Sequence, residues 1–374
     1  MRIVYVLTSL GMGGAERQVL SLAGRMARHG HSVAVLVLRP KLPEEWPTTL
    51  DVIYLNMRKT PLSLLLGVLR GRRFIGKFHP DLIHSHTYPG NMVARLLKLL
   101  SPGTILISTI HNVYEGGWAR MLAYRLTDWL SRSTTAVSTA AAERFVRVKA
   151  VPQSKCRVMV NGIDTAAFAP EAERRAKTRN DLHAAADFIW LAAGRITEAK
   201  DYPNLLRAFA LVRANISFTQ LWVAGEGPED EVRAMHRLEE ELGLDDAVRW
   251  LGLRRDMPAL LDAADGFVLA SAWEGMPLVL GEAMAMEKSV VATDVGGVRE
   301  LVGEAGVIVP AKNPALLAGA MLELMNRSEA ARHELGSAAR IRICASFRMD
   351  AKADEWEVLY RGLLRPSDKP PFIA

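Results

Sequence analysis

A chain of 374 residues is too long for one ordinary hydrophobic core, so its length favours two domains of middling size. Its 49% hydrophobic and 24% charged residues describe a globular protein, and no apolar run approaches the roughly 20 residues that cross a bilayer. The net charge of +6 is unevenly divided, because residues 1–160 carry 22 Lys and Arg against 8 Asp and Glu, a net +14, which leaves the remainder at −8.

The cysteines and the first residues bear on the compartment. Cys156 and Cys344 are too few and too isolated for a disulfide framework or a metal site, which fits a reducing compartment. The chain begins directly with a strand-like run over residues 2–7, without the pattern of a signal sequence. We therefore expect a cytoplasmic protein.

Apolar runs alternate with helical stretches along the first half of the chain. The expected strands cover residues 2–10, 31–38, 51–57, 81–86, 105–112, 134–139 and 158–163, with a first helix from Ala15. This alternation predicts a parallel sheet with crossover helices.

A glycine-rich turn follows the first expected strand. Gly11, Gly13 and Gly14 let the backbone approach a ligand closely, and the N–H groups there could hold a phosphate or an acceptor. A dinucleotide-binding fold is the obvious rival. The order Gly11-x-Gly13-Gly14 lacks the full glycine spacing of that fold, however, and the second strand ends at Arg39 without an acidic residue for a ribose, so NAD binding is disfavoured.

Residues 58–77 combine leucines with basic side chains. Arg70, Arg72, Arg73 and Lys77 follow an apolar run and are interleaved with aromatic residues. The pattern fits a helix lying on an anionic membrane surface, and it fits equally a helix packed on a sheet with its cations in water. No recognition helix or aromatic ribonucleoprotein motif accompanies the charge, so we expect no nucleic acid.

Three histidines lie in or after expected strands. His84 and His86 share one face of a strand, but no third ligand at useful spacing makes a metal site, so packing and hydrogen bonding are favoured. His111 lies near the end of the strand expected over residues 105–112, where it could be structural or could hydrogen-bond a sugar hydroxyl near the reacting centre.

A segment without the alternation of strands and helices separates the two halves of the chain. Residues 164–187 contain Pro170 and a charged run, which is typical of an interdomain connection. Strands are then expected at residues 188–194, 221–225, 248–251, 266–271, 289–293 and 307–309, and a mostly helical region follows Pro314. Two doubly wound sheets in tandem predict a ligand-binding cleft between facing strand ends.

Two cations follow the first strand of the second half. Arg195 can grip a pyrophosphate bidentately and Lys200 can add a compact charge. Together they could stabilise a leaving nucleoside diphosphate without a metal ion.

The most informative stretch is residues 274–282, where Glu274 and Glu282 lie eight positions apart across an expected loop-to-helix junction. Pro277 suits the first turn of that helix. Met276, Leu278 and Val279 would offer backbone N–H groups to a phosphate at the positive helix end. Glu282 could reach back to a ribose diol, and Glu274 could bind hydroxyls at the other end of the ligand.

These motifs together resemble the retaining glycosyltransferases of family four, which have the two-domain GT-B fold. The resemblance spans nearly the whole chain and rests on a set of short motifs: Gly13-Gly14-Ala15-Glu16, Asn161-Gly162-Ile163-Asp164, Gly194-Arg195 with Lys200, Gly225-Glu226-Gly227, Glu274 with Glu282, and Gly296-Gly297-Val298-Arg299-Glu300. Two positions depart from the family pattern, because Asp201 stands where glycine is frequent and Glu287-Lys288-Ser289 replaces a frequent glycine-x-proline turn.

The resemblance implies two Rossmann-like doubly wound domains facing across a cleft. We expect an acceptor-binding domain at 1–165, a linker at 166–187, a nucleotide-sugar domain at 188–348, and a C-terminal helix at 349–374 that returns to the first domain. The resemblance further implies that Glu282 holds the nucleotide ribose and that Glu274 holds the donor sugar. Arg195 and Lys200 would hold the diphosphate. His111 would contact the transferred sugar. Gly13 and Gly14 would approach the donor phosphate, and Glu16 would face the acceptor.

The implied reaction is transfer of a hexose from a nucleotide diphosphate sugar, with UDP favoured, to an acceptor hydroxyl with retention and without metal or another cofactor. The implied acceptor is a lipid-linked or surface-polysaccharide intermediate, as in polysaccharide or lipopolysaccharide biosynthesis, presented at the inner face of the cell membrane. A nucleotide-sugar epimerase of the same fold and a catalytically silent binding scaffold remain as alternatives.

Overall fold

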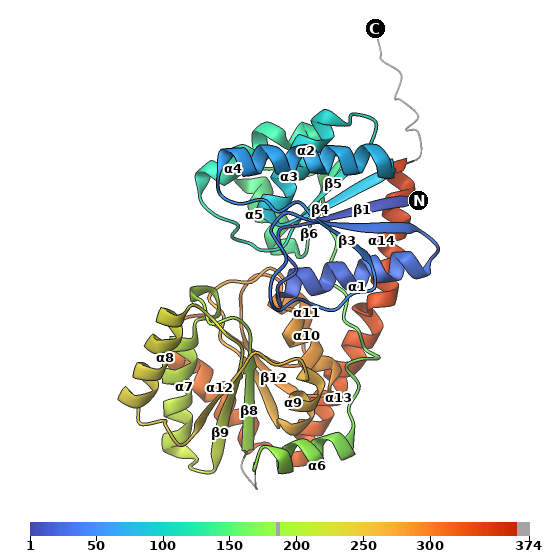
Figure 1. The fold of residues 1–374 in the computed structure, drawn as a ribbon. Coiled ribbons are helices and arrows are strands. Elements are labelled where there is room, and N and C mark those ends of the chain that lie inside the picture. Colours follow the sequence, from blue (N-terminus) through green and yellow to red (C-terminus); the bar gives the residue numbers. More distant parts are fainter. Residues whose placement is uncertain (185–187, 365–374) are drawn as a thin grey trace. The chain divides into compact units, whose positions relative to one another are not determined.

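Two parallel β-sheets organise the chain in the computed structural model, which describes residues 1–184 and 188–364 (Figure 1). The chain divides into two compact units. Unit 1 comprises Met1–Gly162 and the last helix, α14 (Met349–Leu364), and unit 2 comprises Ile163–Arg348. The predicted fold class, two Rossmann-like α/β domains, is therefore confirmed.

Unit 1 is built on a seven-stranded sheet in the order β3-β2-β1-β4-β5-β6-β7. Its strands are β1 (Arg2–Leu7), β2 (Ser32–Val37), β3 (Asp51–Tyr54), β4 (Leu82–His86), β5 (Ile105–Ile110), β6 (Ser133–Ala136) and β7 (Cys156–Val158). Its other helices are α1 (Gly14–Arg28), α2 (Pro61–Phe78), α3 (Thr87–Leu100), α4 (Trp118–Thr127) and α5 (Thr139–Arg147), with 3₁₀ turns η1 (Asp128–Leu130) and η2 (Gln153–Lys155).

Alternate residues of β1 enter different cores, as a sheet covered on both faces requires. Ile3, Tyr5 and Leu7 pack with α1 and α14, whereas Val4 and Val6 pack with α2 and α3. Figure 1 shows α2, α3 and α4 along one face of this sheet.

Unit 2 is built on a six-stranded sheet in the order β10-β9-β8-β11-β12-β13. Its strands are β8 (Phe188–Ala193), β9 (Thr219–Ala224), β10 (Val248–Gly252), β11 (Gly266–Leu269), β12 (Ser289–Thr293) and β13 (Val307–Val309). Its helices are α6 (Ala172–Asp181), α7 (Tyr202–Asn215), α8 (Glu229–Glu241), α9 (Met257–Ala263), α10 (Leu278–Ala285), α11 (Val298–Val302), α12 (Pro314–Asn326) and α13 (Glu329–Ser346), with a 3₁₀ turn η3 (Glu198–Lys200).

Strand order reverses between β8 and β11 in unit 2 and between β1 and β4 in unit 1. In each sheet these two central strands send their crossover connections to opposite sides. The loops after them therefore diverge and leave room for a ligand at the carboxyl edge, the usual binding position in doubly wound sheets.

Two local predictions differ from the structure. The strand expected over residues 158–163 is wrong: the observed strand, β7, ends at Val158. Asn161 and Gly162 interrupt the apolar run after it, and Ile163 makes only an isolated bridge with Arg348. Within the expected linker, α6 is docked on unit 2, where Arg174 pairs with Asp262 and Arg179 Nη1 lies 3.1 Å from Asp265 Oδ2. Residues 185–187 of that segment lie outside the described residues.

Candidate functional site

The loops that follow β8 and β11 meet at the reversal point of the unit 2 sheet. Ala272 N donates to Ala199 O at 2.9 Å and thereby joins the two loops through their backbones. At this junction Lys200 Nζ lies 2.5 Å from Glu274 Oε1. Ser271, at the end of β11, donates its hydroxyl to the same carboxylate oxygen at 2.7 Å. The structure thus brings together two of the predicted site residues.

Glu274 is buried, so its carboxylate needs the hydrogen bonds that these partners supply. The neighbouring glycine loop closes over its backbone: Gly297 N donates to Gly275 O at 2.8 Å. Gly296 has φ +55°, and a Cβ there would overlap the carbonyl oxygen of Glu274. Glycine is therefore required at Gly296 for both conformation and close approach.

The loop after β8 is fixed by a second glycine contact. Gly194 N donates to Ala224 O at 3.0 Å, and a Cβ at Gly225 would overlap Gly194 O. Tyr202 donates its hydroxyl to Gly194 O at 2.8 Å, and burial, with a smaller contribution from Glu274, raises the pKa of Tyr202. Arg195, between these anchored positions, keeps an exposed side chain.

Helix α10 begins one residue after Pro277, which is its N-cap. Leu278 and Val279 are its first two residues, so their N–H groups precede the helical hydrogen bond from Gly281 N to Pro277 O. Met276 is buried just before the helix. A helix start of this kind, close to Lys200, is a suitable place for a phosphate.

Glu282 lies in α10 and is buried. Burying a carboxylate is costly unless it is hydrogen-bonded or paired, so this position is unlike that of an ordinary surface glutamate. Its helix follows β11, so Glu282 and Glu274 belong to one strand–loop–helix segment.

Both departures from the family pattern have a conformational explanation. Asp201 has φ +47° and Glu287 has φ +58°, the left-handed region that favours glycine. Asp201 also accepts a hydrogen bond from Asn204 N and so caps α7. The loops therefore keep the backbone conformation that glycine would adopt.

A cavity of about 420 Å³ lies beside these loops on the α7 and α12 side. It is lined by Glu198, Asp201, Asn204, Arg207, Ala272, Trp273, Lys312 and Pro314. Asp201 and Trp273 adjoin Lys200 and Glu274 in the chain, but neither of those two charged residues lines the cavity.

The remaining predicted residues follow β1 and β5 in unit 1. Gly13 is the N-cap of α1 and Gly14 its first residue. Glu16 folds back over this turn, where its carboxylate accepts a hydrogen bond from the Ser9 hydroxyl at 3.3 Å. A Cβ at Gly13 would overlap that carboxylate, so a larger residue there would displace the Glu16 side chain from the turn.

His111 follows β5 and forms a short chain with the β4 histidines. Its Nε2 lies 2.9 Å from His86 Nδ1, and burial lowers its pKa to about 4. His111 is therefore neutral near pH 7. His84 hydrogen-bonds Tyr360 and Thr109 through its two ring nitrogens, at 2.6 Å each, as the packing interpretation expects.

Sequence reasoning missed Glu115 and the partnership of His86. Glu115 accepts the His111 backbone N–H at 2.9 Å and the Tyr124 hydroxyl at 2.7 Å. Burial raises the pKa of Glu115 to about 7. No motif marks either residue. Only the adjacency of the ends of β4 and β5 in the parallel sheet could have suggested that His86 meets His111.

Among the described residues, the only cluster with metal-ligand geometry is His29, Asp354 and Glu357, between α1 and α14. Glu357 there is already paired with His31 and Arg361. The cluster includes none of the predicted site residues.

Comparison with known proteins agrees with the fold. Residues 12–167 match the model of the Glycosyltransferase Family 4 family, and residues 187–327 match that of Glycosyl transferases group 1. The chain is 27% identical to D-inositol 3-phosphate glycosyltransferase of Thermomonospora curvata, over 94% of this chain and 90% of that protein.

Two further proteins are similar to the chain over most of its length. The chain is 25% identical to an N-acetylgalactosaminyltransferase of Campylobacter jejuni, whose name gives a diphospho-undecaprenol acceptor, over 82% of this chain and 85% of that protein. A crystal structure of Anabaena HepE in complex with UDP and glucose superposes with a TM-score of 0.86 at 21% identity, covering 97% of this chain and all of that one. The chain belongs to the family-four, group 1 glycosyltransferases and has their GT-B fold.

Proposed function

We propose that this glycosyltransferase moves a hexose from a UDP-sugar to an acceptor hydroxyl, with retention at the anomeric carbon and without a metal ion. The observation that carries the proposal is the Lys200–Glu274 pair at the reversal point of the unit 2 sheet. One member can hold a phosphate and the other sugar hydroxyls, so the pair suits the two ends of a sugar–phosphate bond. The likeness to a UDP-binding structure supports UDP as the nucleotide.

In this proposal unit 2 binds the donor. The lysine ammonium has three N–H donors, so Lys200 can keep Glu274 and still reach a phosphate oxygen. The exposed Arg195 adds a bidentate contact, and Leu278 and Val279 add N–H groups from the start of α10. Glu282 accepts the ribose hydroxyls.

The step breaks the bond between the anomeric carbon and the UDP oxygen and forms a bond from that carbon to the acceptor oxygen. Negative charge grows on the leaving diphosphate, where Arg195, Lys200 and the helix start stabilise it. On the same face of the sugar, a leaving phosphate oxygen accepts the proton of the attacking hydroxyl. This route needs no carboxylate nucleophile.

Unit 1 in this proposal contributes His111 to the transferred sugar. A neutral imidazole serves as a hydrogen-bond donor or acceptor without adding charge at the reacting carbon. Gly13 and Gly14 let the backbone come close to the donor phosphate, and the turn held by Glu16 receives the acceptor.

The proposed acceptor is a lipid-linked or surface-polysaccharide intermediate, as the C. jejuni relative suggests. Helix α2 would bring the enzyme to an anionic membrane surface through Arg70, Arg72, Arg73 and Lys77, all of which are exposed. Among the described helices, none has the length and apolar character to cross a bilayer.

The donor is tested by incubating purified protein and EDTA with a panel of UDP-, GDP- and ADP-sugars while free nucleoside diphosphate is measured. We expect slow release from one UDP-sugar, lost in Glu274→Gln and kept in Glu323→Gln, which changes an exposed glutamate on α12. Release that requires added Mg²⁺ would contradict metal independence, and release from another nucleotide would contradict UDP.

Retention is tested on the transfer product. With a donor of α configuration, proton NMR of the new linkage should show an α-glycoside, and a β-glycoside would overturn the retaining assignment. Conversion of the nucleotide-sugar without acceptor would instead indicate the epimerase, and donor binding with no reaction would indicate a silent scaffold.

A further inference from the structure

Exposed apolar side chains are concentrated in one part of unit 1. Of the 20 large hydrophobic side chains exposed in the described chain, 13 lie between residues 61 and 130. Scattered exposed leucines are ordinary on a protein surface, but a concentration of this kind marks an interaction site.

Helix α4 and the turn η1 carry the most exposed aromatic residues of this region. Trp118, Leu122, Leu126 and Trp129 follow one another at intervals of four, four and three residues, which places them along one side of a helix. Trp118 is 78% exposed and Trp129 69% exposed. The opposite side of α4 is buried through Met121 and Tyr124, so this stripe is the outward side.

Helices α2 and α3 extend the same surface. Leu62, Leu65 and Leu69 are exposed on α2, and Leu96 and Leu99 on α3. Figure 1 shows α2, α3 and α4 side by side on one face of the sheet, and contacts link α2 to α3 and α3 to α4. We call these five leucines and the α4 stripe the apolar face.

The charge on these three helices has one sign. They contain Arg70, Arg72, Arg73, Lys77, Arg95, Lys98, Arg120 and Arg125, and no Asp or Glu. Apart from Arg95, which is buried, and Lys98, which is partly buried, these cations are exposed. Within α2, α3 and α4 the apolar face is therefore accompanied by cations alone.

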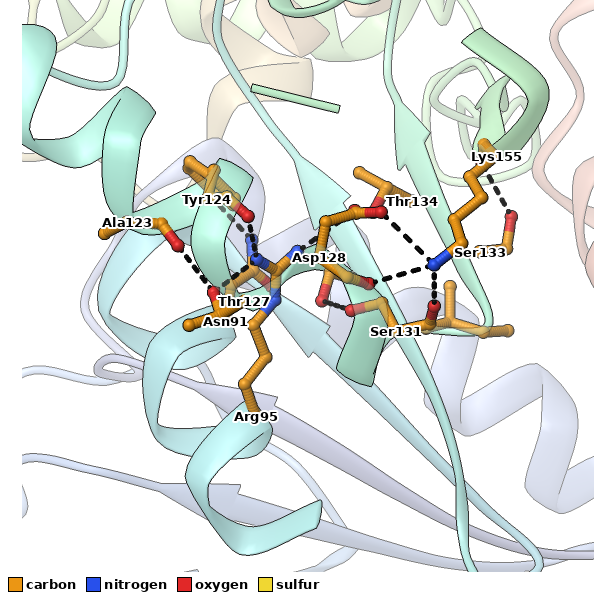
Figure 2. A network of polar contacts seen from close by, with 12 residues as sticks. Asn91, Arg95, Ala123, Tyr124, Thr127, Asp128, Ser131, Ser133, Thr134 and Lys155 are labelled. Carbon is orange, nitrogen blue, oxygen red and sulfur yellow. Dashed lines mark hydrogen bonds and ion pairs between the residues drawn. The ribbon is translucent and has the colours of Figure 1, made fainter. Parts of the chain in front are cut away.

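A buried polar network fixes α4 and η1 in place (Figure 2). Arg95 Nη1 donates to Tyr124 O at 2.9 Å and to the Thr127 hydroxyl at 2.8 Å. Asp128 lies at the start of η1. Its Oδ1 is 3.7 Å from Arg95 Nη2, and its Oδ2 is 3.3 Å from Lys155 Nζ. Trp118 and Trp129 flank this anchored segment, so the stripe is held on a rigid base.

The charges decide between occupants of the apolar face. A second copy of the chain docked by the same surface would place cations opposite cations, which disfavours a symmetric dimer. A nucleic acid would match the charge but would leave leucines without an apolar partner. An anionic bilayer matches both, because its phosphates attract the cations and its acyl region receives Leu and Trp.

We propose that the apolar face enters the interfacial region of an anionic membrane, with Trp118 and Trp129 as its deepest aromatic anchors. The proposal rests on the membrane association assigned to α2 above and adds insertion to electrostatic attraction. Two signals, a polybasic patch and buried apolar area, give more stable attachment than either one alone. The membrane-bound enzyme would then meet lipid-linked acceptors at the depth of their headgroups.

The test is co-sedimentation of the full chain with phosphatidylcholine vesicles, with and without phosphatidylglycerol, at low and high salt. The Trp118→Gln, Trp129→Gln double variant should bind anionic vesicles about tenfold more weakly or worse at either salt, because two apolar anchors are lost. Neutralising Arg70, Arg72, Arg73 and Lys77 to Gln should weaken binding mainly at low salt.

The matched control is Phe218→Gln, an equally exposed aromatic at 77% in unit 2, which should leave vesicle binding unchanged. All variants should keep the wild-type rate of nucleotide release from a soluble donor, so failure here is separate from failure of the proposed activity. If vesicle binding is lost at high salt and is unchanged by the two Trp substitutions, insertion of the apolar face into the membrane is wrong. Absence of vesicle binding, or dimers that the Trp variants dissolve, would overturn the membrane as occupant.

Discussion

At the scale of single residues, the chemistry depends on charges held by a few contacts. Glu274 is buried with Lys200 and Ser271 as its partners, so the site has its carboxylate and its cation in position before a ligand arrives. Preorganised charge of this kind lowers the reorganisation needed during reaction.

Lys200→Met should lower the rate of sugar transfer about 100-fold or more, because it removes a phosphate contact and the counter-ion of Glu274. Steady-state kinetics with the identified donor would measure the change, and Lys312→Met, an exposed lysine at the nearby cavity, serves as the control. A Lys200→Met enzyme of wild-type rate would show that this pair has no part in the reaction.

Glu287→Gly should stabilise unit 2 by up to about 1 kcal/mol, because glycine adopts φ +58° without the strain of a side chain. Glu287→Ala keeps that strain and should give no gain. Asp201→Gly should change the free energy of unfolding little, because relief of backbone strain at φ +47° is offset by loss of the side-chain cap of α7. Denaturant unfolding compares the three, and equal stabilities for Gly and Ala at position 287 would refute the conformational explanation.

At the scale of elements, strand ends and helix starts place the functional groups. Lys200 follows β8, Glu274 follows β11, and His111 follows β5, so the carboxyl edges of parallel strands supply the predicted side chains. Away from these edges, polar networks hold the helices. One of them joins α3, α4 and η1 through Arg95.

Asp128→Asn should destabilise unit 1 by about 3 kcal/mol, because it leaves the buried guanidinium of Arg95 without its carboxylate. Asp246→Asn, which breaks the exposed pair with Arg213, should cost less than about 1 kcal/mol. Urea unfolding of the two variants gives the comparison. Equal losses would mean that the buried network contributes no more than a surface ion pair.

At the scale of the whole molecule, much of the fold was predictable from sequence and the pairing of side chains was not. Alternating apolar runs predicted the parallel sheets, and the 274–282 segment predicted a helix start within one residue of its observed place. The Val158–Ile163 strand failed because an apolar run does not reveal where pairing stops. Lys200 meets Glu274 across 74 positions of sequence, a contact that only the assembled sheet produces.

Buried titratable groups near β4 predict how the stability of unit 1 depends on pH. Burial lowers the pKa of His84, His86 and His111, that of His111 to about 4. Their contribution to stability is therefore full above about pH 6.5, the ordinary value, and is progressively lost as the pH falls below it. Glu115 acts oppositely, because its raised pKa, about 7, favours the folded state at low pH and loses that effect as the pH rises through 7.

His84 faces Tyr360 and Thr109, and His86 faces His111. Glu115 contacts Tyr124 and the backbone N–H of His111, so among the described residues no carboxylate is hydrogen-bonded to one of the three rings. The destabilising effect of the three histidines at low pH should exceed the stabilising effect of Glu115. Hydrogen exchange of the β4 and β5 amides, corrected for intrinsic rates, should therefore be faster at pH 5 than at pH 7. Glu115→Gln should steepen that loss. Slower corrected exchange at pH 5 would contradict the assignment.

The most direct test of the central claim is calorimetric titration of UDP in EDTA against the wild type, Glu282→Gln and Glu323→Gln. If unit 2 binds the nucleotide with Glu282 on its ribose, wild type and Glu323→Gln should bind alike and Glu282→Gln about tenfold more weakly. No UDP binding by the wild type, or equal binding by all three proteins, would contradict the account.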